Sequence, residues 1–206
     1  NKYGDDVVGI CRGYQGLLNC EFWGGSAKEI DVRDVSGLTS AGGAFLNSSR
    51  SDEMRTEAGL QKAANILRRL DFDALITIGG NGTLSGAREL GKYWDGQIIG
   101  IPGTIDNDCG GTAYTIGFAT AAQTGVEAID KLRDTAGSHD RMCIDEVMGR
   151  HCGDLALFIA VASGAELVAI PEVDVTIQEY IEKLERFKLR GKRSMVMVVA
   201  EGNKLG

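Results

Sequence analysis

Residues 97–108 read Gln-Ile-Ile-Gly-Ile-Pro-Gly-Thr-Ile-Asp-Asn-Asp, an apolar run that leads directly into an acidic loop. The run is short and apolar, as expected of a strand that is covered on both faces of a parallel sheet. The loop places Asp106 and Asp108 beside the hydroxyl of Thr104. One such carboxylate can accept a proton while the other helps to hold Mg²⁺, which suits chemistry on phosphate. An Asp-Asn-Asp turn on its own, however, is more often a helix cap.

A glycine-rich loop earlier in the chain favours the phosphate interpretation. Residues 74–78 form another apolar run, and residues 79–83 read Gly-Gly-Asn-Gly-Thr before a helix expected from Leu84. Glycine lets backbone N–H groups approach a phosphate, and a helix N-terminus adds partial positive charge. The loop matches neither the dinucleotide fingerprint nor a Walker loop, and a plain strand–helix connection explains such a turn about half the time. Because loops after adjacent parallel strands face one crevice, the two loops together favour a phosphate site.

Apolar runs and segments with helical periodicity alternate along the whole chain. Strands are expected at residues 6–11, 74–78, 97–101, 142–147, 167–170 and 195–200. Helices are expected at residues 60–70, after a charged first turn at 51–53, and at 118–136 and 177–187. This alternation predicts an α/β fold with a mainly parallel sheet. The chain opens on an expected strand and stops just after another, so we expect an internal fragment of a longer protein.

The composition is that of an ordinary globular protein, with 43% hydrophobic and 25% charged residues among 206. This length suffices for one large domain or two small ones. A net charge of −7 argues against a general nucleic-acid-binding protein, which needs a basic face. The five cysteines form no Cys-x-x-Cys pair, and no apolar run is long enough to span a bilayer. We therefore expect a cytoplasmic protein without nucleic-acid or membrane partners.

Charged residues stand at the ends of the last expected strands. Arg141 precedes the strand at 142–147, and Met148-Gly-Arg150 follows it. Two arginines so placed can each bind phosphate oxygens by a bidentate fork, although helix caps or surface ion pairs explain them equally well. Glu201 follows the final strand. It could accept hydrogen bonds from sugar hydroxyls, or be a solvated acid in a turn.

These motifs, in this order and spacing, resemble the 6-phosphofructokinases of the ATP-dependent bacterial type. The resemblance runs from residue 7 to Glu201 and is most specific at residues 102–108 and 148–150. It implies a phosphofructokinase-like α/β fold of two Rossmann-like, three-layer parallel-sheet domains. A boundary near Gly117 would separate a nucleotide-binding part, residues 1–117, from a fructose 6-phosphate-binding part, residues 118–206. The implied reaction transfers the γ-phosphoryl group of ATP, with Mg²⁺, to the 1-hydroxyl of fructose 6-phosphate.

The resemblance also implies catalytic roles for Asp106, Thr104 and Arg150, and a metal-binding role for Asp108. Asp106 matches the general base, and Arg150 matches the arginine that stabilises charge in the transition state. Thr104 and Asp108 match groups around the metal and the transferred phosphoryl group. Asn81 stands where the family usually has an aspartate near Mg²⁺, and because an amide carries no charge we expect weaker metal binding.

Further residues match substrate-binding positions. Contacts to the sugar phosphate are implied for Met148, Gly149 and Glu201, and Arg141 matches an arginine that reaches the 6-phosphate of a neighbouring subunit. The family's active site therefore needs a homo-oligomer, a tetramer by resemblance. The residues implied on the nucleotide side are Tyr14, Arg50, Gly80, Asn81, Gly82, Thr83 and Gly86.

Two glycines bear on the phosphoryl donor. Members of the family that use pyrophosphate carry an acid at the position of Gly82 and a lysine at that of Gly103. Side chains there occupy the space of the nucleotide's α-phosphate, so glycine at both positions favours ATP. A separate set, Arg133, Glu166, Arg190 and Lys192, resembles a regulatory site that binds a nucleotide diphosphate or phosphoenolpyruvate between subunits. The alternative is a basic helix end at residues 190–193 that complements the helix dipole.

Three other interpretations stay open at this point. A lipid or NAD kinase also uses a Gly-Gly-x-Gly-Thr turn but lacks the acidic loop and the Met-Gly-Arg cluster. A non-catalytic phosphofructokinase-like half would bind a sugar phosphate or effector, but it would have lost the acid that stands here as Asp106. A pyrophosphate-dependent phosphofructokinase is disfavoured by Gly82 and Gly103. The family's N-terminal glycine-rich loop and its later sugar-binding segments are not in this sequence, so we expect the chain alone to be inactive.

Overall fold

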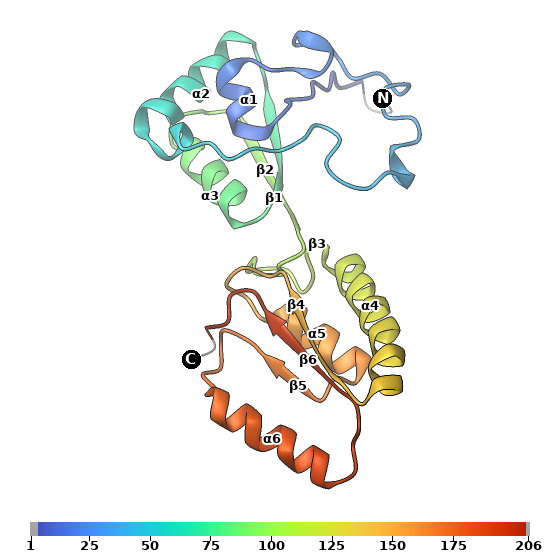
Figure 1. Cartoon of the computed structure of the whole chain (residues 1–206). Helices are drawn as coiled ribbons and strands as arrows, with labels where there is room; N and C mark the ends of the chain where they lie inside the picture. Colours follow the sequence, from blue (N-terminus) through green and yellow to red (C-terminus); the bar gives the residue numbers. More distant parts are fainter. Residues whose placement is uncertain (1–3, 205–206) are drawn as a thin grey trace. The chain divides into compact units, whose positions relative to one another are not determined.

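The computed structural model describes residues 4–204 (Figure 1). The α-helices are α1 (Gly13–Asn19), α2 (Glu57–Arg69), α3 (Asn81–Leu90), α4 (Phe118–His139), α5 (Asp154–Ser163) and α6 (Ile177–Leu189). The strands are β1 (Ala74–Gly79), β2 (Gln97–Thr104), β3 (Ile116–Gly117), β4 (Met142–Val147), β5 (Leu167–Ala169) and β6 (Met195–Ala200). Short 3₁₀ helices are η1 (Trp23–Gly25), η2 (Leu38–Ser40) and η3 (Glu53–Arg55).

By its contacts, the described chain forms two compact units. The first comprises residues 4–77 and 82–101, and the second comprises residues 78–81 and 102–204. The glycine-rich loop is thus divided, and its first residues belong with the acidic loop. The predicted functional division near Gly117, into residues 1–117 and 118–206, stays a prediction. Residues 1–3 and 205–206 of these two parts lie outside the described residues.

The core of the first unit lies between α1, α2 and one face of β1. Leu17, Leu60, Leu67 and Leu75 are buried there together with Trp94. Helix α2 begins at a side-chain cap, because Thr56 accepts a hydrogen bond from the N–H of Gly59. Along β1 the buried and exposed positions alternate, as expected when the described helices pack on one face of the sheet.

The second unit has three layers around the sheet β4-β6-β5, which is parallel throughout. Its central strand β6 is buried along most of its length, because both faces are covered. Val196, Val198 and Ala200 pack in the cluster with residues of α4 and α5. Met197 and Val199 alternate with these residues along the strand and pack in a separate cluster with Tyr180 of α6. This arrangement confirms the predicted α/β class with parallel sheets.

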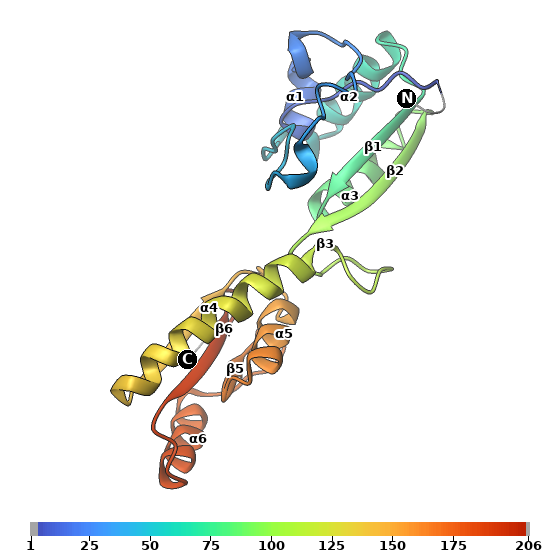
Figure 2. The same cartoon turned by 90° about the vertical axis from the view of Figure 1, so that its right-hand side faces the viewer.

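A second sheet has the order β1-β2-β3, with β3 parallel to the end of β2. The arrows of β1 and β2 point the same way in Figure 2, so the loops that follow them leave the sheet at the same edge. This edge carries both the glycine-rich and the acidic loop.

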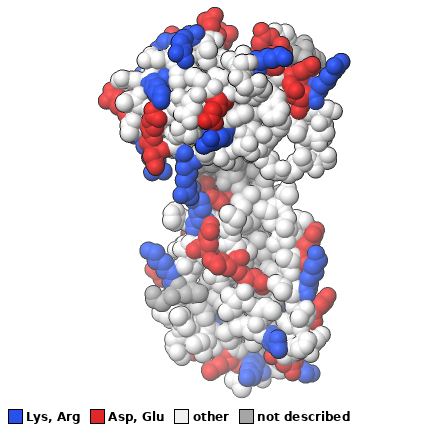
Figure 3. Space-filling view, turned by 45° about the horizontal axis from the view of Figure 1, so that its top comes forward, with Lys and Arg blue, Asp and Glu red and all other residues white. Residues whose placement is uncertain are grey.

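Acidic and basic side chains are interspersed over each unit on the face drawn in Figure 3.

Most predicted elements are confirmed, with small differences at their ends. The strands at 142–147 and 195–200 match β4 and β6 residue for residue, and those at 74–78, 97–101 and 167–170 correspond to β1, β2 and β5. The three predicted helices correspond to α2, α4 and α6. The helix expected from Leu84 begins earlier, at Asn81. Among residues 4–204, no helix is both long and apolar enough to cross a membrane.

Three expectations about the first half of the chain are wrong. Residues 6–11 form no strand and make only isolated bridges, at Val8 and Ile10. Their backbone groups bond instead to neighbouring loops; for example, the carbonyl of Val7 accepts from the N–H of Ile30 at 2.7 Å. Consequently the described chain does not open on a strand. The charged turn at 51–53 leads into η3 and is not the first turn of α2, which starts at Glu57.

Helices α1 and α5 were not predicted from the sequence.

Candidate active site

The acidic loop begins where β2 ends, at Thr104. The hydroxyl oxygen of Thr104 accepts a hydrogen bond from the backbone N–H of Asp106 at 3.2 Å, which turns the chain out of the strand. Asp106 is one of few buried polar residues, with 8% of its surface exposed. The next residue, Asn107, has a left-handed backbone with φ of 52°. The acidic loop is therefore a turn that a side-chain hydrogen bond stabilises, and it contains one buried carboxylate.

The environment of Asp106 raises the pKa of its carboxyl group. Burial is the main cause, and the negative charge of Asp108 adds to it, while the positive charge of Arg150 opposes it. A raised pKa brings a carboxylate closer to the value that suits a general base. The charges of Asp108 and Arg150 thus act on the carboxyl group of Asp106 in opposite directions.

The glycine-rich loop meets the acidic loop through Asn81. The side-chain amide of Asn81 donates to the carboxylate of Asp108 at 2.8 Å and to its backbone carbonyl at 3.2 Å. Gly80 lies against Thr104: a Cβ on it would come within 3.4 Å of the threonine Cβ. The predicted meeting of the two loops is thus present in the second unit.

A second loop of the same unit, between β4 and α5, carries Arg150. Its backbone is unusual, because φ is 134° at Gly149 and 55° at Arg150. One carboxylate oxygen of Glu201 accepts from the N–H groups of Gly149 and Arg150, at 3.2 and 2.7 Å. A Cβ at Gly202 would lie 1.8 Å from the carbonyl oxygen of Arg150. Glu201 and Gly202 therefore shape the arginine loop, and a sugar contact by Glu201 stays a prediction.

The remaining predicted substrate residues are exposed. Met148 has 58% of its surface exposed, and Arg141 lies exposed just before β4. The backbone N–H of Arg141 donates to the carbonyl of Ala136 at the end of α4, which fixes its backbone position. Its predicted target, a phosphate in a neighbouring subunit, lies outside this chain.

The oxygen atoms of the loop fit Mg²⁺ only in part. Asp108 and Asn81 offer hard oxygen ligands, the type that Mg²⁺ prefers. Within residues 4–204, however, no group of three or more His, Cys, Asp or Glu side chains could hold a metal ion. Mg²⁺ commonly uses one or two protein ligands and takes the rest from water and substrate phosphates. The residues therefore fit an ion that arrives with a nucleotide.

On the nucleotide side, Tyr14 packs on the first turns of α3. Its hydroxyl donates to the carbonyl of Thr83 at 2.7 Å, and burial raises the pKa of Tyr14 to about 12. A Cβ at Gly86 would lie 2.7 Å from the tyrosine ring, so glycine is required by this packing. Arg50 is exposed in the loop before η3. Tyr14, Thr83 and Gly86 are brought together in the first unit, and their nucleotide contacts stay predictions.

The two glycines that bear on the phosphoryl donor differ in their surroundings. A Cβ at Gly82 would meet nothing within 4 Å, so protein packing does not demand glycine there. A Cβ at Gly103 would lie 2.9 Å from the side chain of Ile78. Packing alone explains Gly103, whereas Gly82 leaves space that a ligand could use.

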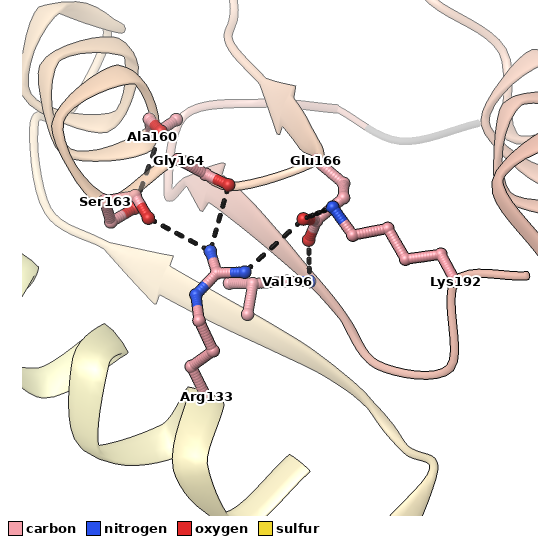
Figure 4. Close-up of polar contacts among 7 residues, drawn as sticks. All are labelled: Arg133, Ala160, Ser163, Gly164, Glu166, Lys192 and Val196. Carbon is pink, nitrogen blue, oxygen red and sulfur yellow. Dashed lines mark hydrogen bonds and ion pairs between the residues drawn. The ribbon is translucent and has the colours of Figure 1, made fainter. Parts of the chain in front are cut away.

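Two of the four predicted effector residues, Arg133 and Lys192, converge on a third, Glu166, whose side chain is 3% exposed (Figure 4). Its carboxylate pairs with Lys192, contacts Arg133 at 3.4 Å and accepts from the N–H of Val196 at 2.6 Å. Burial would raise its pKa, but the hydrogen bonds from Lys192 and Val196 outweigh burial and lower it. Arg190 is exposed at the C-cap of α6.

Arg133 also has a structural role in this cluster. Its guanidinium donates to the carbonyls of Ser163 and Gly164, each at 3.0 Å, at the end of α5 (Figure 4). An arginine there satisfies carbonyls that the helix leaves unpaired and complements its dipole. Arg133 therefore supports the end of α5, a role different from the predicted helix-end alternative, which concerned residues 190–193 at the end of α6.

Sequence reasoning missed the residues that hold the loops in place. Asn107, Thr115 and Asp154 join the acidic loop to β3 and α5. Glu172 accepts from the N–H of Gly153 at 2.7 Å and so fixes the start of α5. The left-handed preference of Asn within Asp-Asn-Asp was an available signal. The contacts of Thr115 and Glu172 depend on the tertiary fold and have no sequence signature.

Comparison with known proteins identifies the class. Residues 1–206 match the family described as Phosphofructokinase, and the chain therefore belongs to that family. It is 48% identical over 200 residues to the ATP-dependent 6-phosphofructokinase of Clostridioides difficile (strain 630), covering 97% of this chain and 61% of that protein. The enzyme of that name from Paenibacillus macquariensis is 47% identical over 97% of this chain and 60% of its own length. The chain spans about 60% of the length of these curated relatives.

Solved structures agree on the fold. Pichia pastoris phosphofructokinase in the T-state matches with a TM-score of 0.88 and 34% identity, over 98% of this chain and 23% of that one. A pyrophosphate-dependent phosphofructokinase from Marinobacter aquaeolei matches with a TM-score of 0.79 over 97% of this chain and 53% of its own. At 21% identity, the second match supports the fold alone.

Proposed function

We propose that the complete protein is an ATP-dependent 6-phosphofructokinase of glycolysis. It transfers the γ-phosphoryl group of ATP to the 1-hydroxyl of fructose 6-phosphate and gives fructose 1,6-bisphosphate. The observation that carries this proposal is the buried Asp106, whose pKa is raised and which lies under the opposed influence of Asp108 and Arg150. Because the chain spans about 60% of its relatives' length, we assign the activity to the complete protein and expect the chain alone to be inactive.

In the proposed reaction, Asp106 accepts the proton of the sugar hydroxyl as the hydroxyl oxygen attacks the γ-phosphorus of ATP, and the bond from that phosphorus to the bridging oxygen breaks to release ADP. Arg150 offsets the negative charge that develops on the transferred group, and Thr104 helps to position that group. Asp108, oriented by Asn81, would hold Mg²⁺ together with phosphate oxygens. When bound, Mg²⁺ neutralises phosphate charge during transfer.

ATP is the proposed donor because of Gly82. The open space at this position supports a bound nucleotide, since an acid there would repel and displace the α-phosphate. The names of the curated relatives, ATP-dependent 6-phosphofructokinases, support the same choice. Gly103 adds less than the sequence suggested, because Ile78 already demands glycine there.

The test is a coupled assay of the complete protein with fructose 6-phosphate, comparing ATP with pyrophosphate. We expect turnover with ATP, and we expect Gly82→Asp to raise KM for ATP more than tenfold with a small change in KM for fructose 6-phosphate. Ala128→Asp, on the exposed side of α4, controls for the added negative charge. Faster turnover with pyrophosphate would replace the donor, and no turnover with either donor would favour a non-catalytic half.

The proposal extends to the assembly and its regulation. By resemblance, the enzyme is a cytoplasmic homo-oligomer, a tetramer, in which Arg141 reaches the 6-phosphate in a neighbouring subunit. Lys192 and Arg190 would bind a nucleotide diphosphate or phosphoenolpyruvate beside Glu166. Activity curves that do not change with ADP or phosphoenolpyruvate would remove the regulatory part while leaving the reaction intact.

A further inference from the structure

Asn107 uses both ends of its side-chain amide. The amide nitrogen donates to the carboxylate of Asp154 at 3.0 Å and to the carbonyl of Ala113 at 3.4 Å. The amide oxygen accepts from the backbone N–H of Thr115 at 2.9 Å. One side chain therefore ties the acidic loop to the start of α5 and to the segment before β3.

The contact with Thr115 is part of a closed hydrogen-bonded loop. The hydroxyl of Thr115 donates to the carbonyl of Thr104 at 2.6 Å, and Thr115 is 4% exposed. Thr104 in turn accepts from the N–H of Asp106. A change at Asn107 would therefore reach Thr104 and Asp106 through hydrogen bonds between buried or half-buried groups.

The backbone of Asn107 lies between the two carboxylates of the site. Its φ of 52° is in the left-handed region, which Asn adopts more readily than most residues. Because Asp106 and Asp108 are its direct neighbours in the chain, rotation about its backbone would re-aim both of their side chains. The side-chain contacts of Asn107 hold this conformation.

Asp154 connects the acidic loop to the arginine loop. It is the first residue of α5, and the segment immediately before it carries Gly149 and Arg150. We propose that Asn107 is a positioning residue, which fixes the carboxylates of Asp106 and Asp108 relative to Arg150 through its hydrogen bonds to Asp154 and Thr115. Its effect on catalysis rests on the proposed function.

An aspartate cannot replace Asn107 in this arrangement. It would keep the acceptor for Thr115 but lose the donor, and it would bring a second carboxylate to the carboxylate of Asp154. Exchanging the two side chains, by Asn107→Asp with Asp154→Asn, restores one donor and one acceptor across the contact. A specific hydrogen bond predicts rescue by this exchange, whereas a general need for asparagine does not.

The test compares steady-state kinetics of the complete protein and its variants. Asn107→Asp should lower kcat about tenfold or more, because small misplacements of catalytic groups are costly, with less than threefold change in either KM. Asp154→Asn should change kcat about twofold. The double variant should recover to within about threefold of the wild type. An unchanged kcat in Asn107→Asp, or a double variant no better than Asn107→Asp, would overturn the inference.

Hydrogen exchange separates this inference from the proposed function. Asn107→Asp should speed amide exchange in residues 102–108 and 149–154 together, and the double variant should slow both again. Asn47→Asp is a matched control, because Asn47 is an exposed residue of the first unit that also has a left-handed backbone, with φ of 58°. A wild type without turnover would contradict the proposed function alone; unchanged exchange in Asn107→Asp would contradict the positioning role.

Discussion

The carboxylates of Asp106 and Glu166 are both withdrawn from solvent in the second unit, but their pKa values shift in opposite directions. Burial raises both and is the largest influence on each. Asp106 has Asp108 as a neighbour, and its pKa rises. Glu166 has Lys192, Arg133 and the N–H of Val196, and its pKa falls. The neighbouring groups therefore decide the direction of the pKa shift. Asp106 takes up a proton more readily than an ordinary aspartate, whereas Glu166 stays ionised and binds its cationic partners.

Replacement of Asp106 should give the largest effect. Asp106→Asn keeps the shape of the side chain but cannot accept the proton, so we expect kcat of the complete enzyme to fall about 10²–10⁴-fold. Its unfolding free energy should stay equal or rise slightly, because a buried charge is removed. Coupled assays and urea unfolding measure both quantities. A kcat within threefold of the wild type would favour a binding role for this half.

Replacement of Glu166 should give the reverse pattern. Glu166→Gln leaves Arg133 and Lys192 without a counter-charge, and since both cations are partly exposed we expect a loss of about 1–2 kcal/mol in unfolding free energy. Without effectors, kcat should change little. Glu185→Gln, an exposed position on α6, is the control. Equal stability of the Glu166 and Glu185 variants would contradict a structural role for Glu166.

The difference in unfolding free energy between the wild type and Glu166→Gln should depend on pH in a definite direction. Because the pKa of Glu166 is lowered on folding, its contribution to stability is present above the unfolded pKa and is lost as pH falls through the folded pKa. The gap between wild type and Glu166→Gln should therefore close in acid. A gap that stays constant down to the acid transition would show that charge is not its cause.

The rate of the enzyme should respond to pH through Asp106. Since the pKa of Asp106 is raised, its protonated and inactive form persists to a higher pH than that of an ordinary aspartate. The fall of kcat/KM on the acid side of the pH profile should therefore begin at a higher pH. Arg150→Gln removes the charge that opposes the rise of this pKa, so the acid limb of its residual activity should move to higher pH. A limb that does not move would dissociate Arg150 from Asp106.

A third carboxylate, that of Asp145 in β4, should give the smallest effect. One of its oxygens is buried and, within the described residues, has no hydrogen-bond partner, and burial raises its pKa. Asp145→Val should stabilise the protein by about 0.5–1 kcal/mol near neutral pH, because the residue is only half-buried. The folded pKa is raised, so the cost of the charge disappears as pH falls through it and the gain should shrink in acid. Urea unfolding at two pH values tests this, and a destabilised variant would contradict it.

The sequence predicted the parts of the fold in which local pattern and tertiary structure agree. Strand β6 is a continuous apolar run that becomes the buried centre of the sheet in the second unit. Helix α6 has a capping box at Thr176 with Glu179. Helix α5 was missed because residues 155–161 are apolar all round, so they have no helical stripe; only Gly153 and Gly164 marked its ends. The strand expected at residues 6–11 was wrong because an apolar run does not by itself supply a pairing partner.

The sequence predicted the reactive groups of the candidate site but did not predict the residues that hold its loops in place. Asp106, Asp108, Asn81 and Thr104 stand in loops after two adjacent strands, and the structure brings those loops together. Glu201 was predicted as a sugar contact, yet one of its oxygens holds the backbone of the arginine loop. Such contacts join residues about fifty positions apart in the chain, so no local pattern reveals them.

The most direct test of the central claim is the turnover number of Asp106→Asn and Glu166→Gln in the same complete, effector-free enzyme, with ATP and fructose 6-phosphate. The account predicts that Asp106→Asn loses at least a hundredfold in kcat, while Glu166→Gln keeps kcat within threefold of the wild type. Similar losses in the two variants, or a larger loss in Glu166→Gln, would contradict it.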